Sequence, residues 1–200
     1  MDGSENTAPP VAAVILAAGA ASRMGQPKLL LPWNGEPLIC HAARTALAAG
    51  LAPVVVVTGA GASAVQTALL GLAVQLVYNP IWETGQSTSV RAGLNALPSQ
   101  VQAVLFLLGD QPYVTVELIK ELVKTYSATR PAILAPFVGE KRSNPVLFDR
   151  STFDVLSRLQ GDAGARSIFA QYPPQAMHWP DERLLLDIDT PQDYQRLVGK

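Results

Sequence analysis

The sequence predicts an α/β fold in which helices cover both faces of a mostly parallel sheet. Two observations predict it. Continuous apolar runs alternate with helical patterns up to residue 137, which is the order of repeated βαβ units with right-handed crossovers. The runs are hydrophobic at nearly every position rather than at alternate positions, as expected for strands that are buried on both faces.

Each expected strand is an apolar run bounded by turn residues, and each expected helix is an amphipathic stretch between two such runs. VQAVLFLLGD is the most apolar strand, and TVELIKELVKTYS is the clearest amphipathic helix. The expected strands are 11–18, 53–59, 73–79, 101–110 and 131–137, and the expected helices are 36–50, 62–72, 84–97 and 115–127.

The segments after residue 137 are shorter and mixed in character. We expect them to form a small flap within residues 138–186, which includes SNPVLFD, a helix near 151–159 and GDAGARSIFAQY. A terminal helix from Pro191 closes the domain. Residues 1–10 are small, polar and proline-containing, so we expect a disordered tail. Residues 11–200 then form a single domain.

The composition disfavours several classes of protein. The chain has 200 residues, of which 48% are hydrophobic and 16% charged, with a net charge of −1. Proteins held to nucleic acid by phosphate contacts normally carry a basic excess, so we expect no nucleic-acid partner. No apolar run reaches about 18 residues and the start lacks a basic region, so we expect neither a membrane span nor a secretory signal. Cys40 is the single cysteine, which suits a cytoplasmic location.

The loop after the first strand has the composition of a phosphate-binding site. In an open parallel sheet, ligands bind beyond the carboxyl ends of the strands, and the segment Leu16–Lys28 starts there. Small residues let backbone N–H groups approach phosphate oxygens, while an arginine clamps two oxygens and a lysine supplies a point charge. We therefore expect nucleotide contacts from Leu16, Ala17, Ala18, Gly19, Ser22, Arg23, Gly25 and Lys28.

Two familiar phosphate loops do not match this segment. The dinucleotide signature G-x-G-x-x-G is absent, because the next glycine after Gly19 is Gly25. The Walker A form ends in G-K-[ST], whereas Gly25 is followed by Gln-Pro-Lys. Pro27 also disfavours a helix through the loop, so we expect an extended coil that wraps a triphosphate. The alternative interpretation is a Gly/Ala turn that carries two solvated cations.

A carboxylate at the tip of the most apolar strand indicates a metal site. Asp110 ends the strand 101–110 at the same sheet edge as the loop, and a buried carboxylate needs a counter-charge. Mg²⁺ favours one or two carboxylates together with substrate phosphates and water. DIDTPQDY offers Asp187 and Asp189, which alternate if the segment is extended, so that one faces the site. We expect Asp189 as the second ligand and keep Asp187 as the alternative; the competing interpretation of Asp110 is a cap of the turn 109–112.

Together these residues resemble the MobA-like nucleotidyltransferases, and within them the molybdenum cofactor cytidylyltransferase branch. The matching pieces are LAAGAASRMGQPKLLLP, TGQSTSVRAGL, LLGDQPYVT, SNPVLF, GDAGAR and DIDTP, spread over residues 14–194. The first and third are typical of the wider superfamily, whereas SNPVLF and GDAGAR point to the molybdopterin-related branch. The resemblance implies a Rossmann-like three-layer α/β/α sandwich.

The resemblance also implies a reaction: an NMP moves, with CTP as the favoured donor, onto the terminal phosphate of molybdopterin or the molybdenum cofactor, and pyrophosphate is released. It implies that Arg23 and Lys28 bind the triphosphate and that Asp110 and Asp189 hold Mg²⁺, with Mn²⁺ as the alternative ion. Arg23, Lys28 and Asp110 are the expected catalytic residues. The serine that often stands two residues before the arginine is Ala21 here, and Ser22 is its expected substitute. Thr58 and Ser87 join the nucleotide-binding residues, and the expected acceptor-binding residues are Asn144, Pro145, Gly161, Asp162, Gly164 and Arg166.

Other functions stay open at this point. A related transferase would use GTP or another phosphorylated acceptor, and CTP is favoured by the branch resemblance alone. A nucleotide-binding module without turnover would be supported by loss of Arg23, Lys28 or Asp110, and all three are present. A dinucleotide oxidoreductase is disfavoured by the missing glycine signature. For the transferase, we also expect hand-over of the product to a molybdoenzyme or its chaperone.

Overall fold

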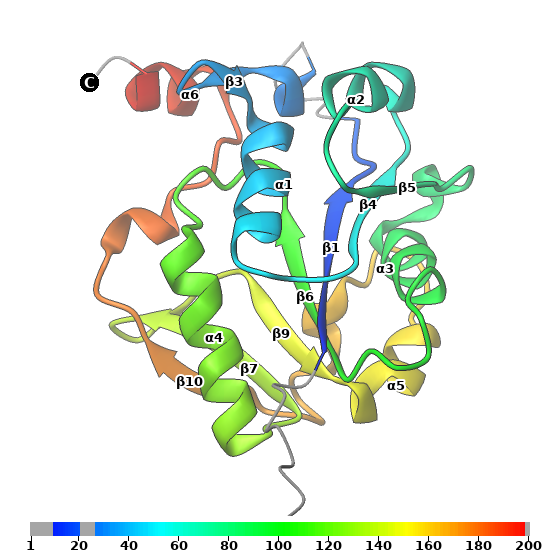
Figure 1. Cartoon of the computed structure of the whole chain (residues 1–200), viewed down its shortest axis with the longest axis vertical. Coiled ribbons are helices and arrows are strands. Elements are labelled where there is room, and N and C mark those ends of the chain that lie inside the picture. Colours follow the sequence, from blue (N-terminus) through cyan, green and yellow to red (C-terminus); the bar gives the residue numbers. More distant parts are fainter. Residues whose placement is uncertain (1–9, 21–26, 199–200) are drawn as a thin grey trace, which may run out of the picture.

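The computed structural model describes residues 10–20 and 27–198. A central sheet runs through the molecule, and helices lie on both of its faces (Figure 1). The expected tail falls almost wholly outside the described residues, as do Ser22, Arg23 and Gly25 of the opening loop. Over the described part, the predicted α/β fold with a mostly parallel sheet is confirmed.

The eight-stranded sheet has the order β10-β7-β9-β6-β1-β4-β5, with the short β8 paired to β7. Pairing is parallel between β1 and both of its neighbours, between β4 and β5, and between β7 and β10. The strand β9 is antiparallel to both β6 and β7. The strands are β1 (Val11–Ala17), β4 (Val54–Thr58), β5 (Gln75–Tyr78), β6 (Ala103–Leu108), β7 (Ile133–Val138), β8 (Lys141–Arg142), β9 (Val146–Asp149) and β10 (Gln175–His178).

The helices fall between the strands as the alternating pattern predicts. They are α1 (Leu38–Ala48), α2 (Ala62–Ala68), α3 (Gln86–Asn95), α4 (Val116–Thr129), α5 (Phe153–Ser157) and α6 (Pro191–Val198). Short 3-10 turns are η1 (Lys28–Leu30), η2 (Trp82–Thr84), η3 (Arg150–Thr152), η4 (Ala165–Ile168) and η5 (Glu182–Leu185), and β2 (Pro32–Trp33) pairs with β3 (Glu36–Pro37). None of the helices in the described residues is long and apolar enough to cross a membrane.

The two faces of the sheet support two separate hydrophobic cores. In β1, Ala13 and Ile15 belong to the core under α1, α2 and α4, whereas Val14 belongs to the core under α3 and α5. Successive strand residues point to opposite faces, so an apolar run that is buried at every position requires helices on both sides. Figure 1 shows α1 and α4 lying in front of the sheet.

Several element ends differ from the expected ones for local reasons. The strand expected to end at Asp110 ends at Leu108, which leaves Gly109 and Asp110 in the turn beyond the sheet. The helix expected over 84–97 begins at Gln86, because residues 82–84 form a 3-10 turn and Gly85 has a backbone conformation with φ +122° and ψ 165°, a region open essentially to glycine alone.

The segment 138–186, expected to form a flap, also supplies β8, β9 and β10 to the sheet. The strand β9 lies between β6 and β7 and pairs Val146 with Phe106 at one end and Asp149 with Ala103 at the other. The pairing of β9 with β6 therefore attaches the neighbouring residues of this segment to the middle of the sheet.

One buried polar contact fastens α4 to the end of β9. Tyr126 is fully buried, and its hydroxyl donates to Asp149 Oδ2 at 2.5 Å. Burial and the bond to Asp149 raise the pKa of Tyr126 to about 12. Burial raises the pKa of the Asp149 carboxyl, but hydrogen bonds from Ser151 and Tyr126 outweigh burial and hold that pKa below its usual range.

We expect Gly93→Val to lower the free energy of unfolding by about 1–3 kcal/mol, the usual cost of overpacking a core. Gly93 lies on the buried face of α3, and a Cβ there would sit 2.4 Å from Val14 Cγ1 and 3.3 Å from Val57 Cγ2. Urea unfolding measures the change. Asn95→Ala, at an exposed position of the same helix, is the control and should stay within about 0.5 kcal/mol of wild type. An equal effect of the two substitutions would contradict the packing.

We expect Tyr126→Phe to lower the free energy of unfolding at pH 7 by about 1–3 kcal/mol, the range for bonds to charged groups. The depressed pKa of folded Asp149 means that its contribution is complete above its unfolded pKa of about 3.9 and is lost as the pH falls through the lower folded value. The difference between variant and wild type should therefore shrink in acid. Tyr172→Phe is the control, because Tyr172 donates to no described residue. A pH-independent difference in urea unfolding would show that Asp149 is not the partner.

Candidate functional site

The site is built where two neighbouring parallel strands end. β1 and β6 pair in register up to Leu16 and Leu108, so the segments that follow them leave the sheet at the same edge. Ligands of open parallel sheets bind beyond this edge. The residues expected to meet here are those of the opening loop and Asp110.

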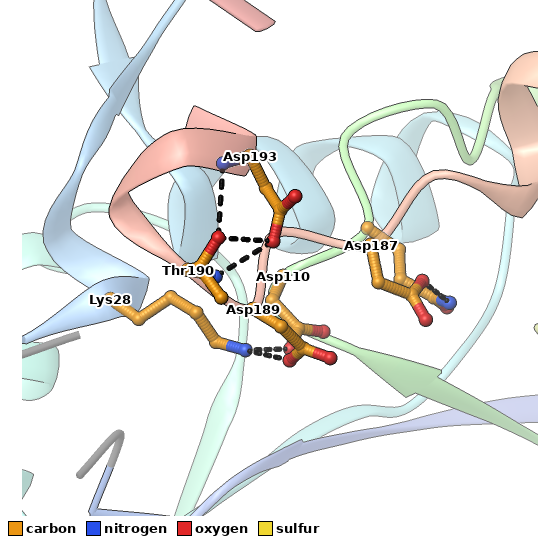
Figure 2. Close-up of polar contacts among 7 residues, drawn as sticks. Lys28, Asp110, Asp187, Asp189, Thr190 and Asp193 are labelled. Carbon is orange, nitrogen blue, oxygen red and sulfur yellow. Dashed lines mark hydrogen bonds and ion pairs between the residues drawn. The ribbon is translucent and has the colours of Figure 1, made fainter. Parts of the chain in front are cut away.

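The ammonium of Lys28 joins three segments at this edge. Its Nζ lies 2.5 Å from Asp110 Oδ2 and 3.1 Å from Asp189 Oδ1, and Figure 2 shows the two carboxylates converging on it. Only 13% of the Lys28 side chain and 18% of the Asp110 side chain are exposed, against 45% for Asp189. Lys28 and Asp110 therefore form the partly desolvated core of the cluster, and Asp189 closes it from the solvent side.

The surrounding charges keep Lys28 protonated. Burial lowers the pKa of the Lys28 ammonium, but the charge of Asp110, its hydrogen bond and the further contact with Asp189 together raise it above the ordinary value. The second oxygen of Asp110, Oδ1, is buried and has no hydrogen-bond partner among the described residues. An unpaired buried carboxylate oxygen is costly, so this atom is available as an acceptor for a bound group.

Asp187 has a different partner from Asp189. Its Oδ1 accepts from Gln111 Nε2 at 2.6 Å, and Figure 2 shows it apart from the Lys28 cluster. Desolvation and the negative charges of Asp110 and Asp189 raise the pKa of Asp187, although part of the residue is open to solvent. The hydrogen bond from Gln111 and the positive charge of Lys28 lower this pKa but do not outweigh the increase. The segment is coil rather than strand here, and the following helix α6 is capped by the reciprocal bonds of Thr190 and Asp193.

A tight backbone contact joins the start of α3 to the segment 161–164. The hydroxyl of Ser87 donates to the carbonyl oxygen of Gly161 at 2.7 Å, and the N–H of Gln86 donates to Asp162 Oδ1 at 3.4 Å. A Cβ on Gly85 would lie 2.2 Å from the same Gly161 oxygen, and a Cβ on Gly164 would lie 2.3 Å from Gln86 Oε1. Glycine at position 85 is therefore what lets the two backbones approach, whereas a side chain at position 164 would meet only the flexible end of Gln86.

Two cavities adjoin at this contact and share Leu16, Gln86 and Leu108. The first, of about 400 Å³, also includes residues of the opening loop, η2 and α3. The second, of about 330 Å³, extends over β6, β9 and η4. The first cavity is lined by Leu16, Ala18, Gly19, Trp82, Glu83, Gly85, Gln86, Ser89, Leu108 and Asp162. The second is lined by Leu16, Gln86, Phe106, Leu108, Arg142, Asn144, Val146, Phe148, Gly164, Ala165, Arg166, Phe169 and Asp187.

Seven of the expected residues line these cavities, whereas Lys28, Asp110 and Asp189 belong to neither lining. Leu16, Ala18 and Gly19 line the first cavity, and Asn144, Gly164 and Arg166 line the second, while Asp162 lines the first rather than the acceptor side. Ala17 and Pro145 are buried beside them, and Gly161 supports the contact with α3. Thr58 and Ser87 are buried, and their hydroxyls donate to the carbonyl oxygens of Val77 and Gly161. They therefore support the backbone near the site and do not line either cavity.

Sequence inspection did not single out Gln86, Gln111 and Arg142 as site residues. Gln86 lines both cavities, Gln111 holds Asp187, and Arg142 lines the second cavity. Gln86 and Gln111 belong to the motifs TGQSTS and GDQP, so their place in these motifs could have identified them as site residues. Arg142 belongs to no recognised motif. Among the described residues, 10–20 and 27–198, no group of three or more His, Cys, Asp or Glu side chains is arranged to hold a metal ion.

Comparison with known proteins gives a consistent family match. Residues 13–176 match the model of the MobA-like NTP transferase domain. A relative named nicotine blue oxidoreductase, from Paenarthrobacter nicotinovorans, is 34% identical over 200 residues, which covers 95% of this chain and 97% of the relative. The molybdenum cofactor cytidylyltransferase of Escherichia coli (strain K12) is 24% identical over 182 residues, covering 90% of this chain and 92% of the relative.

Solved structures agree with the family match. A crystal structure of a Mycobacterium tuberculosis H37Rv protein has a TM-score of 0.86 at 28% identity and covers 97% of this chain and 100% of its own. Its complex with manganese has a TM-score of 0.79 at 28% identity, covering 95% and 98%. A nucleotidyl transferase from Methanothermobacter thermautotroptrophicus has a TM-score of 0.80 at 25% identity, covering 94% and 96%.

We expect Gly85→Ala to destabilise the protein by at least about 1 kcal/mol more than Gly71→Ala does. Both glycines have positive φ, +122° and +82°, but a Cβ on Gly71 meets nothing within 4 Å, whereas one on Gly85 meets the Gly161 backbone. The difference between the variants in urea unfolding isolates that contact. Amide NMR shifts in residues 161–164 should move in Gly85→Ala alone, and equal behaviour of the two variants would disprove a tight contact.

Proposed function

The chain belongs to the MobA-like NTP transferase family, and from that premise we propose that it transfers CMP from CTP onto the terminal phosphate of a molybdopterin-type acceptor, with release of pyrophosphate. One observation carries the proposal at the site. Lys28 bridges Asp110 and Asp189 at the carboxyl edge of the sheet, beside two adjoining cavities that share Leu16, Gln86 and Leu108. Such an edge can place a triphosphate in one cavity and its acceptor in the other.

The proposed chemistry asks for positioning rather than for a strong base. An oxygen of the acceptor phosphate forms a bond to the α-phosphorus while the bond from the α-phosphorus to the bridging oxygen breaks, and the electron pair leaves with pyrophosphate. A phosphate monoester has its second pKa near 6 and is largely ionised at pH 7, so no side chain has to remove a proton. Lys28 offsets charge on the triphosphate and on the departing pyrophosphate. Arg23 is proposed to assist it from the part of the loop outside the described residues.

The donor set fits a hard divalent cation. Asp110 Oδ1 is buried and unpartnered, and Asp189 presents a second carboxylate to the same ammonium. Mg²⁺ is bound in proteins by one or two carboxylates together with phosphates and water, which matches a site without a preformed cage. We propose that Asp110 and Asp189 hold Mg²⁺, with Mn²⁺ as an alternative. When bound, the ion supplies positive charge that stabilises the transferring phosphate.

The choice of substrates follows from resemblance and is supported by the second cavity. Asn144, Gly164 and Arg166, which belong to the acceptor-side motifs, line one cavity together. The Escherichia coli relative is a molybdenum cofactor cytidylyltransferase, which supports CTP over GTP and a molybdopterin acceptor. A product of this kind would be handed to a molybdoenzyme or its chaperone, and we propose such a partner.

One observation favours a second candidate function. The relative with 34% identity over nearly the whole chain is named as an oxidoreductase, so dinucleotide-dependent oxidoreduction is the competing proposal. The chain lacks the G-x-G-x-x-G signature of dinucleotide sites. Its edge cluster of Lys28 with two carboxylates suits a metal-bound triphosphate better than a neutral nicotinamide ring. We therefore keep nucleotidyl transfer as the leading proposal.

We expect Lys28→Ala and Asp110→Ala each to lower turnover by on the order of 10²-fold or more, the scale for one preorganised electrostatic group. The assay is pyrophosphate release by purified protein with Mg²⁺, each NTP in turn, and molybdopterin present or absent. Lys124→Ala is the matched control, because Lys124 is exposed and its one ion-pair partner within residues 10–20 and 27–198 is Glu121 on α4, and it should keep wild-type turnover.

Near-normal pyrophosphate release by Lys28→Ala or Asp110→Ala would sink the site assignment. A parallel assay follows oxidation of NADH and NADPH in the presence of nicotine blue, the compound in the relative's name. Dinucleotide oxidation without pyrophosphate release from any NTP would replace nucleotidyl transfer by the second candidate. Pyrophosphate release that requires GTP, or another acceptor, would keep the reaction class and change the substrate.

A further inference from the structure

We propose that Arg142 and Arg166 together form an anion subsite in the second cavity, which binds the phosphate group of an aromatic acceptor. The two guanidinium groups come from separate elements, β8 and η4, and line the same cavity of about 330 Å³. The inference rests on the proposed function in taking the bound group to be the acceptor phosphate. Nothing in the sequence motifs assigns Arg142 to the site.

Neither guanidinium has a protein counter-ion in the described ranges 10–20 and 27–198. No carboxylate of these residues lies within 4.0 Å of Arg142 or Arg166, although Asp187 also lines this cavity. Burial and the neighbouring charge of Arg166 lower the pKa of Arg142. Two cations that line one cavity and have no carboxylate within ion-pair distance repel each other, and an anion bound between them removes that cost.

The position of Arg142 is fixed by packing. Its guanidinium carbon lies 4.7 Å from the centre of the Phe169 ring, so the planar group is held by a cation–π contact. A guanidinium fixed in this way presents its N–H groups as a fork that matches two oxygens of a phosphate. Arg166 is more exposed and adds a second positive charge to the lining of the same cavity.

The aromatic residues that line the cavity favour a ligand with a ring next to the bound anion. Phe106, Phe148 and Phe169 line the cavity, with Phe106 edge-on to Phe148 and Phe148 stacked on Phe169. Asn144 and Gln86 supply polar groups within the same lining. The lining thus combines aromatic rings with charged and amide groups, and polar groups placed in this way fix the orientation of a bound small ligand. The ligand class is therefore a planar aromatic compound that carries a phosphate monoester.

Phenyl phosphate is the probe, because it carries the ring and the dianion and nothing else. We expect it to bind wild-type protein, with ¹H–¹⁵N NMR shifts at the amides of Ala165 and Val146 in the second cavity. Arg142→Gln should weaken this binding by at least about ten-fold, the loss expected for one charge-assisted contact. Arg142→Lys should bind between the two, because it keeps the charge and loses the planar fork. Benzyl alcohol, which lacks the phosphate, should bind wild type at least about ten-fold more weakly.

Arg158→Gln is the matched control. It removes the same charge from an exposed arginine that lines neither cavity, and it should bind phenyl phosphate as wild type does. Thermal unfolding tests whether each variant is folded. If Arg142→Gln does not fold, the comparison of phenyl phosphate with benzyl alcohol on wild-type protein still tests whether the cavity binds the phosphate group. The subsite is disproved if Arg142→Gln binds like wild type, if benzyl alcohol binds as tightly as phenyl phosphate, or if the shifts centre on Gly19 and Ser89 of the first cavity.

Titration of the same variants with CTP and Mg²⁺ separates this inference from the proposed function. Arg142→Gln should keep wild-type affinity for CTP. Failure of wild-type protein to bind CTP or any other NTP would remove the nucleotidyl-transfer proposal and leave the phenyl phosphate result to stand alone. Wild-type CTP binding together with unchanged phenyl phosphate binding by Arg142→Gln would remove the subsite and leave the transferase.

Discussion

The contact on which the site depends is the Lys28 ammonium shared by Asp110 and Asp189. It brings together the end of the opening loop, the turn after β6 and the segment before α6. Lys28 and Asp189 are 161 positions apart in the sequence. Removing the charge of one partner from a partly buried pair leaves the other uncompensated, which commonly costs several kcal/mol. The same C-terminal segment is anchored beside Lys28 by a small core of Leu31, Leu38 and Ile188. The fold thus holds its last segment against its first loop by charge and by packing.

A second constraint is the close approach of α3 to the segment 161–164, which sets how the two cavities meet. Gly85 and Gly164 leave room for the backbone and for Gln86, and Ser87 and Asp162 then fix the two segments by hydrogen bonds. Gln86 stands at the junction and lines both cavities. In the proposed function, two substrates bound in the two cavities would both lie next to Gln86, and such proximity is what a transfer between them requires.

The sequence determines some of this architecture plainly and leaves other parts without a local signal. The runs that become β1 and β6 are apolar at every position, so their burial and their parallel pairing could be predicted. Asp110 is expected at the end of the strand itself, whereas it lies in the turn two residues beyond Leu108. The place of β9 between β6 and β7 could not, because four residues of antiparallel strand carry no mark of their neighbours. The separate partners of Asp187 and Asp189 follow from a coil conformation that no periodicity encodes. Arg142 was missed because its importance depends on Phe169 and Arg166, which are distant in the sequence.

The charges at the sheet edge also bear on why a divalent cation belongs to the proposed reaction. Among the described residues, Asp110, Asp187 and Asp189 bring three carboxylates to this edge, and Lys28 is the ammonium that faces two of them. A triphosphate approaching this edge would meet like charge, and the low local dielectric makes that repulsion stronger than in water. Lys28 cannot offset both the phosphates and the carboxylates with one positive charge. A nucleotide that arrives with its own divalent cation removes this conflict, because the cation adds positive charge where Asp110 Oδ1 is still unpartnered.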